Sequence, residues 1–223
     1  MVVTGSRLDE LTARARRTIA ATGGVAPVAE PEPHVRAVAV SRGLVSPTEV
    51  GDAVVIGFDP GIATTGYGVV SGSSRGDGKY VARTHGVIET TAQTPTPDRL
   101  AYIHDRVSLL LRHHKPTGAA VEKLFFGRNA PTAMAVGQAR GVILLALAQA
   151  RVPVVEYTPL EVKSALAGFG RAPKAQMQRM IQVLLELDAI PRPDDAADGL
   201  ALALTHLRLA AGRLARAGAS ADM

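Results

Sequence analysis

Two apolar runs, residues 54–58 and 67–70, are joined by a tight turn and constrain the fold more than any other stretch. Apolar runs a turn apart are typical of a β-hairpin. The first run ends on Asp59, followed by Pro60 and Gly61, so Asp59 stands where a buried strand leaves the sheet. A carboxylate there is costly to bury without a cation or hydrogen-bond donors. Taken alone, Asp-Pro-Gly is equally typical of an aspartate that caps a turn.

Three strands in a meander, followed by alternating helices and strands, predict an α/β fold. We expect a five-stranded mixed sheet flanked by helices on both faces. The predicted strands are residues 53–58, 66–71, 80–89, 118–121 and 152–157. The predicted helices are residues 97–115, with Thr96 as N-cap, 131–150, 159–167, with a Thr158–Glu161 capping box, 174–187 and 194–210.

The chain divides by composition into three parts. Residues 1–52 contain a short amphipathic helix pattern and a Pro-rich, charged segment that buries little surface. We interpret them as a flexible extension, or as the product of a start codon assigned upstream of the true one, because no methionine follows Met1 before Met134. Residues 53–210 form the predicted folded domain. Residues 211–223 are predicted to be a mobile tail.

Composition excludes several classes of protein. The 223 residues include no cysteine, which excludes disulfides, thiolate metal sites and a cysteine nucleophile. No apolar run approaches the roughly 18 residues of a membrane span, and charged residues interrupt the N-terminus, so we expect a cytoplasmic protein without a membrane anchor. The net charge of +5 is compatible with a polyanionic partner such as nucleic acid.

Four carboxylates are placed where they can converge. Asp59 and Glu122 each end an apolar strand, and if those strands are parallel neighbours both side chains leave the same sheet edge. Asp195 and Asp198 lie three residues apart at the start of the last helix and share one helical face. Acidic residues at that place also simply complement the helix dipole.

Converging carboxylates cannot all remain ionised without cations between them. Oxygen ligands without histidine or cysteine suit Mg²⁺ or Mn²⁺. Two such ions roughly 4 Å apart activate a water and stabilise the leaving oxygen of a phosphodiester. The residues therefore indicate metal-assisted phosphodiester hydrolysis.

These motifs resemble those of the RuvC Holliday-junction resolvases. The matching segments are Gly57-Phe58-Asp59-Pro60-Gly61 with Thr65-Gly66-Tyr67-Gly68-Val69, Val121-Glu122-Lys123-Leu124-Phe125 with Asn129, Gly137-Gln138-Ala139-Arg140-Gly141, and Asp195-Ala196-Ala197-Asp198 with Leu200-Ala201. Their order and spacing agree over about residues 53–208.

The resemblance implies a ribonuclease-H-like fold and a homodimer that resolves four-way DNA junctions by paired symmetric nicks. It also implies cooperation with the branch-migration proteins RuvA and RuvB. By position, it makes Asp59, Glu122, Asp195 and Asp198 the catalytic carboxylates that bind two Mg²⁺ or Mn²⁺ ions. Asp194 precedes Asp195, and only the motif match favours Asp195 over its neighbour.

The resemblance also identifies DNA contacts. Phe125 matches an aromatic that stacks on bases at the junction centre, and a Phe among basic residues suits unstacked bases. The alternative is that Phe125 and Phe126 both pack into the sheet edge. Lys163 and Lys174 match basic positions near the scissile phosphate, and Arg128 and Arg171 are further candidates for phosphate contacts.

The helix predicted over residues 131–150 suits a dimer interface, because Ala133, Gly137 and Gly141 allow close helix approach. Intramolecular packing uses the same small residues, so the sequence leaves both interpretations open.

Three other functions remain as alternatives. An actin-like or sugar-kinase ATPase also opens with a strand–Asp–x–Gly turn, but needs a second Gly-rich turn, and only Gly168-Phe169-Gly170 follows residue 150. A ribonuclease-H-like nuclease acting on RNA shares the carboxylates but not the Phe-bearing loop. A non-catalytic junction-binding protein would lack one or more carboxylates.

Overall fold

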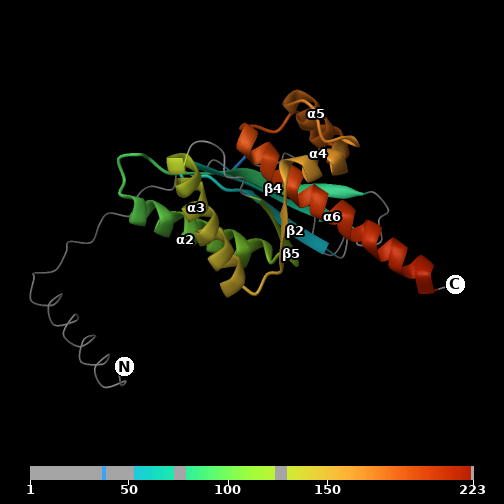
Figure 1. The fold of residues 1–223 in the computed structure, drawn as a ribbon, viewed down its shortest axis with the longest axis horizontal. Helices are drawn as coiled ribbons and strands as arrows, with labels where there is room; N and C mark the ends of the chain where they lie inside the picture. Colours follow the sequence, from blue (N-terminus) through green and yellow to red (C-terminus); the bar gives the residue numbers. More distant parts are fainter. Residues whose placement is uncertain (1–36, 39–52, 73–78, 124–129, 222–223) are drawn as a thin grey trace, which may run out of the picture. The chain divides into compact units, whose positions relative to one another are not determined.

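A mixed β-sheet with helices on both faces forms the folded part of the chain (Figure 1). The computed structural model describes residues 37–38, 53–72, 79–123 and 130–221, and side chains for most of them. All of these lie in one compact unit, residues 34–223. In the part of the chain so described, no helix has the length and apolar character needed to cross a membrane.

The strand order in the sheet is β1-β4-β3-β2-β5-β6. Strands β2, β3 and β4 form an antiparallel meander, and β5 and β6 are added parallel to β2. The strands are β1 (Ala37–Val38), β2 (Ala53–Asp59), β3 (Thr64–Gly72), β4 (Tyr80–Glu89), β5 (Gly118–Glu122) and β6 (Val154–Tyr157). The five predicted strands are therefore confirmed as β2 to β6.

The helices divide between the two faces of the sheet. Figure 1 shows α2 and α3 side by side on one face, and α6 crossing the other, with α4 and α5 near its beginning. They are α2 (Thr96–His114), α3 (Ala130–Gln149), α4 (Pro159–Ala167), α5 (Lys174–Leu184) and α6 (Asp194–Ala221).

Strand alternation decides which residues face which helices. In β2, Ile56 and Phe58 point into a core shared with α2 and α3, whereas Val55 belongs to the core under α6. Since successive side chains alternate between faces, Asp59 has the same orientation as Val55, toward α6. In β5 the same rule puts Glu122 on the face of Ala120, again toward α6.

Several bounds differ from the sequence prediction: α5 ends at Leu184 and not at 187, β6 begins at Val154 and not at 152, and three further differences concern β1, α2 and α6. A two-residue strand, β1, lies within the segment interpreted as a flexible extension and pairs with β4 through Gly86 and His85. The N-cap of α2 is Pro95, with no side-chain cap bond, so Thr96 is already helical. Helix α6 continues to Ala221 beyond its predicted end at residue 210, because the Ala-, Leu- and Arg-rich sequence favours helix strongly enough to tolerate isolated glycines.

The capping box predicted for α4 is confirmed. The Glu161 backbone N–H donates to Thr158 Oγ1 over 3.1 Å, and the Thr158 N–H donates to Glu161 Oε2 over 2.7 Å. These bonds satisfy two helix donors and fix where α4 begins, directly after β6 at the carboxyl edge of the parallel strands.

Candidate active site

Strand β2 delivers Asp59 to the sheet edge, and the turn that follows is held by hydrogen bonds. Thr65 Oγ1 donates to the Gly61 carbonyl over 2.7 Å. Thr90, beyond the end of β4, donates its hydroxyl to the Ile62 carbonyl over 2.5 Å and accepts a bond from Arg99 Nε over 2.7 Å. Because these bonds restrain the turn, the backbone leaving Asp59 has a defined direction.

Glu122 lies beside Asp59. Strands β2 and β5 are parallel, with Phe58 paired to Val121, so the next residue of each strand leaves the sheet at the same edge. The carboxyl groups of Asp59 and Glu122 interact by a hydrogen bond as well as by charge. The predicted convergence of the two strand-end carboxylates is therefore present in the structure.

Helix α6 brings Asp195 and Asp198 to the same edge through close contact with β3. The first turn of the helix lies against Gly66, and the following turn lies against Gly68. A Cβ built on Gly68 would come within 2.6 Å of Leu200 Cα, and one on Gly199 within 2.6 Å of Tyr67 Cα. Only glycine permits backbones to approach this closely.

Asp194 has different surroundings from its neighbour Asp195. Its carboxylate accepts bonds from Gln178 Nε2 over 2.9 Å and from Arg192 Nη1 over 2.7 Å, and lies 3.3 Å from Lys174 Nζ. The charge of Asp195, by contrast, acts on both Asp59 and Asp198. Asp194 thus ties α5 to the start of α6, while Asp195 belongs to the carboxylate cluster.

Burial and like charges make ionisation of Asp59 and Asp198 costly. Burial, followed by the charge and hydrogen bond of Glu122 and the charge of Asp195, raises the pKa of Asp59 to about 8. Burial also raises the pKa of Asp198, with Asp59 and Asp195 adding to the effect against the opposing charge of Lys174. Raised pKa values of this kind show that too little positive charge lies near these two carboxylates to stabilise their ionised forms.

Lys174 is the basic side chain closest to this cluster among the predicted DNA contacts. Its Nζ lies 3.4 Å from Asp198 Oδ2. Burial alone would lower the pKa of Lys174, but the charges and hydrogen bonds of Asp198 and Asp194 together raise it. The ammonium group therefore stays protonated beside the carboxylates.

The other predicted DNA contacts are less closely tied to the cluster. Lys163 lies half-buried in α4, and Arg171 is exposed just before α5. Phe125 and Arg128 fall in the segment 124–129, outside the described residues, and so does the Phe-bearing loop as a whole.

The donor set fits a hard divalent cation, since all four clustered side chains offer carboxylate oxygens. The raised pKa of Asp59 has the same implication, because added positive charge would stabilise its ionised form. Within the described residues, however, no three His, Cys, Asp or Glu side chains stand at metal-binding spacing. The carboxylates converge without forming a closed coordination shell.

Sequence reasoning missed the glycines that position α6. The sequence contains these glycines at the predicted hairpin, and in the structure Gly57 pairs with Gly68 and Gly66 pairs with Asp59. Recognising their role required knowing which helix covers that face, which is a tertiary fact.

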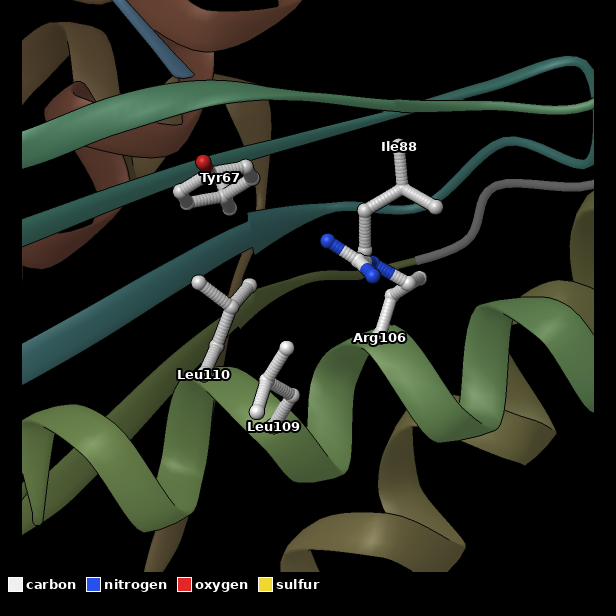
Figure 2. A pocket seen from close by; sticks show the side chains of 5 residues that line it. All are labelled: Tyr67, Ile88, Arg106, Leu109 and Leu110. Atoms are coloured by element: carbon white, nitrogen blue, oxygen red, sulfur yellow. The ribbon is translucent and has the colours of Figure 1, made fainter. Parts of the chain in front are cut away.

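A small cavity on the opposite face is not part of this site. It is lined by Tyr67, Ile88, Arg106, Leu109 and Leu110, between α2 and the sheet (Figure 2). Its volume of about 20 Å³ admits one water molecule. The chemistry therefore belongs to the carboxylate edge and not to this cavity.

Comparison with known proteins gives a consistent result. A family model described as crossover junction endodeoxyribonuclease RuvC matches residues 55–206. The enzyme of that name from Thermomicrobium roseum is 50% identical over 154 residues, covering 69% of this chain and 92% of its own length.

Solved structures agree. The structure of T. thermophilus RuvC in complex with a Holliday junction substrate has a TM-score of 0.68 at 42% identity, covering 71% of this chain and 95% of that one. The yeast mitochondrial Holliday junction resolvase has a TM-score of 0.54 at 16% identity, covering 73% of this chain and 82% of its own. The second likeness concerns the fold alone.

Proposed function

The chain belongs to the RuvC family of crossover junction endodeoxyribonucleases, and we propose that it resolves Holliday junctions in DNA by paired symmetric nicks. The observation that carries this proposal is the meeting of Asp59, Glu122, Asp195 and Asp198 at one sheet edge, because it supplies the acidic centre that phosphodiester hydrolysis needs. A relative of 42% identity has been solved with a Holliday junction substrate.

Nucleases of this family depend on divalent metal, and we assign the ligands to these four carboxylates, holding two Mg²⁺ or Mn²⁺ ions. Bound at this edge, such ions supply Lewis acidity and lower the pKa of a coordinated water. The four carboxylates would hold the ions in place through their oxygen atoms. The raised pKa of Asp59 supports the assignment, since a cation would relieve its charge burden.

Lys174 is suited to contact the scissile phosphate. Its ammonium group stands 3.4 Å from Asp198 Oδ2 and is held there by two carboxylates, so it can donate to a non-bridging phosphate oxygen without leaving the site. Lys163 and Arg171, on α4 and before α5, would bind flanking phosphates. Phe125 and Arg128 are proposed by motif match alone, with Phe125 stacking on bases.

A homodimer is proposed through α3. The exposed side of this helix carries Met134, Gln138, Gly141 and Leu145, spaced by three or four residues. Met134 is 66% exposed and Leu145 is 52% exposed, and apolar side chains that share one exposed helix face are typical of an interaction surface. A second copy covering this stripe would place two identical sites on two strands of one junction.

The dimer proposal can be tested at Gly141, because a Cβ there meets no atom of the described residues within 4 Å. Gly141→Arg should leave the monomer folded, shift the mass in light scattering to one chain and abolish paired nicking. An unchanged mass would exclude α3 as the interface. Cooperation with RuvA and RuvB, proposed by family, predicts faster resolution when both are added.

Two alternatives remain open to the same assay. A nuclease acting on RNA would use the same carboxylates, and a non-catalytic binder would use only the basic residues. The ATPase alternative lacks the second Gly-rich phosphate-binding turn that it needs, because only Gly168-Phe169-Gly170 follows residue 150. A cytoplasmic location is part of the same proposal.

The deciding experiment is cleavage of a synthetic four-way DNA junction with Mg²⁺ or Mn²⁺. Linear duplex, forked DNA and an RNA–DNA hybrid serve as competing substrates. Asp59→Asn should abolish cutting, whereas Asp105→Asn, which removes an exposed carboxylate on α2, should not. Cutting of the hybrid alone would transfer the function to RNA, and junction binding without cutting under any metal would indicate a non-catalytic role.

A further inference from the structure

Gly66 lies between the strand carboxylate Asp59 and the helix carboxylate Asp195. In β3 it is the register partner of Asp59 on β2. On the α6 side, its nearest neighbours are atoms of Asp195. One residue without a side chain thus separates the strand that carries Asp59 from the helix that carries Asp195.

The fit leaves no room for a side chain. A Cβ built on Gly66 would lie 2.9 Å from Asp195 Cβ and closer still to the Asp195 carbonyl group. These are backbone atoms and the first side-chain atom of a helical turn, which cannot rotate away as the end of a long side chain can. Any residue other than glycine must therefore displace the start of α6 from the sheet.

The atoms that an added Cβ would meet change along β3, as the other glycines of this strand show. At Gly68 an added Cβ meets Leu200, more than one turn farther along α6. At Gly72 the three nearest atoms belong to the Tyr80 ring, at 2.6 and 3.1 Å, and to the Lys79 carbonyl, and none of these three lies in α6. Displacement of Asp195 is thus expected to be largest for a change at Gly66, smaller at Gly68 and absent at Gly72.

We infer that Gly66 is a positioning residue whose missing side chain sets the separation between Asp195 and Asp59, and with it the size of divalent cation that the carboxylates accept. The inference rests on the proposed metal-dependent function. Its physical basis is that Mg²⁺ demands near-ideal octahedral geometry at short distances, whereas larger cations tolerate a wider and less regular site.

A shift of Asp195 by a fraction of a methyl group's width therefore affects Mg²⁺ most. For Gly66→Ala we expect the Mg²⁺ concentration that gives half of the maximal rise in melting temperature, or half of the maximal cleavage rate, to increase at least tenfold. The corresponding Mn²⁺ concentration should increase less. A change in packing alone would lower stability without altering the ratio of the two constants.

The test compares Gly66→Ala, Gly68→Ala and the matched control Gly72→Ala. Each purified variant is titrated with Mg²⁺ and with Mn²⁺, and the rise in melting temperature is measured, a readout that needs no cleavage. Junction cleavage is titrated in parallel, and junction affinity is measured in EDTA. For each protein we compare the half-maximal Mg²⁺ concentration divided by the half-maximal Mn²⁺ concentration. We expect this ratio to be the same in wild type and Gly72→Ala, higher in Gly68→Ala and highest in Gly66→Ala. Junction affinity should be the same in all four proteins.

An unchanged ratio in Gly66→Ala, or an equal change in Gly72→Ala, overturns the inference. If Gly66→Ala does not fold, Gly68→Ala decides, because it must then differ from Gly72→Ala in the same ratio. Failure of wild-type protein to cleave any junction would instead refute the proposed function. The two failures are therefore distinguishable.

Discussion

On the face of the sheet covered by α6, helix backbone touches strand backbone, whereas α2 and α3 cover the other face through interlocking aliphatic side chains. The contact under α6 is built on Gly57, Gly66, Gly68 and Gly199. The core under α2 and α3 contains fully buried Ile103, Val107, Ile143 and Leu147.

The difference has a chemical meaning. Side-chain packing stabilises the fold but tolerates small shifts, because rotamers adjust and similar volumes substitute for each other. Backbone contact through glycine has no such freedom, so it fixes the helix within a fraction of an ångström. The face that places two carboxylates against two others combines this glycine contact with an apolar core of its own, which includes Ile181, Leu200 and Leu204, whereas the opposite face is packed through side chains.

The largest effect is expected from the first turn of α6, where Asp194 and Asp195 differ in role. Asp195→Asn should lower junction cleavage by about a thousandfold, since loss of a proposed metal ligand removes several kcal/mol of transition-state stabilisation. Asp194→Asn should cost about tenfold or less, because it loosens bonds to Gln178, Arg192 and Lys174 but removes no proposed metal ligand. Single-turnover rates at saturating metal measure both. A reversed order would exchange the roles of the two aspartates.

The opposite face should respond in stability and not in chemistry. Ile103→Ala removes a fully buried side chain from α2 and should lower the free energy of unfolding by about 3 kcal/mol. Denaturant unfolding measures the loss. Leu109→Ala, on the same helix but 44% exposed, should cost less than about 0.5 kcal/mol. A changed metal requirement in folded Ile103→Ala would contradict the separation of the two faces.

Adding one methyl group between β2 and α6 should lower stability by an amount comparable to the loss from Ile103→Ala on the other face. A Cβ on Gly57 would approach Ala203 N to 2.6 Å and Leu202 Cβ to 2.9 Å. Gly57→Ala should therefore destabilise the protein by about 1–3 kcal/mol through overpacking. Thermal unfolding measures it. Unaltered stability would mean that α6 moves freely on the sheet, and the rigid-contact interpretation would be wrong.

The smallest effect concerns acid stability at the end of α2, away from the carboxylates. Burial, together with the charges of His113 and Arg83, lowers the pKa of His114 from 6.5 to about 4. Because the unfolded chain binds this proton more readily, the stabilisation is fully present above about pH 6.5 and is lost as pH falls toward 4. His114→Gln should reduce this loss by about 1 kcal/mol, discounted for partial exposure. Unfolding curves at pH 4.5 and 7.5 measure it, and equal pH slopes for both proteins would refute it.

Much of the architecture follows from the local pattern. The apolar runs that end on Asp59 and Glu122 identified both strands, and Thr158 with Glu161 marked the start of α4, because these signals depend on neighbours in sequence. The ordered motifs also identified the family. The β1 pairing was missed, since two residues carry no periodicity, and the length of α6 was underestimated because residues 211–223 were interpreted as a mobile tail.

The sequence by itself determined which residues are chemically able to form the site: four carboxylates at strand ends and a helix start, with a basic residue nearby. Only the tertiary structure decided their arrangement. It separated Asp194, bound by Gln178 and Arg192, from Asp195, which acts on Asp59. It also showed that Gly66 lies between Asp59 and Asp195. The physical reason is that these distances depend on how closely α6 approaches β3, which is a contact between residues about 130 positions apart and leaves no local pattern.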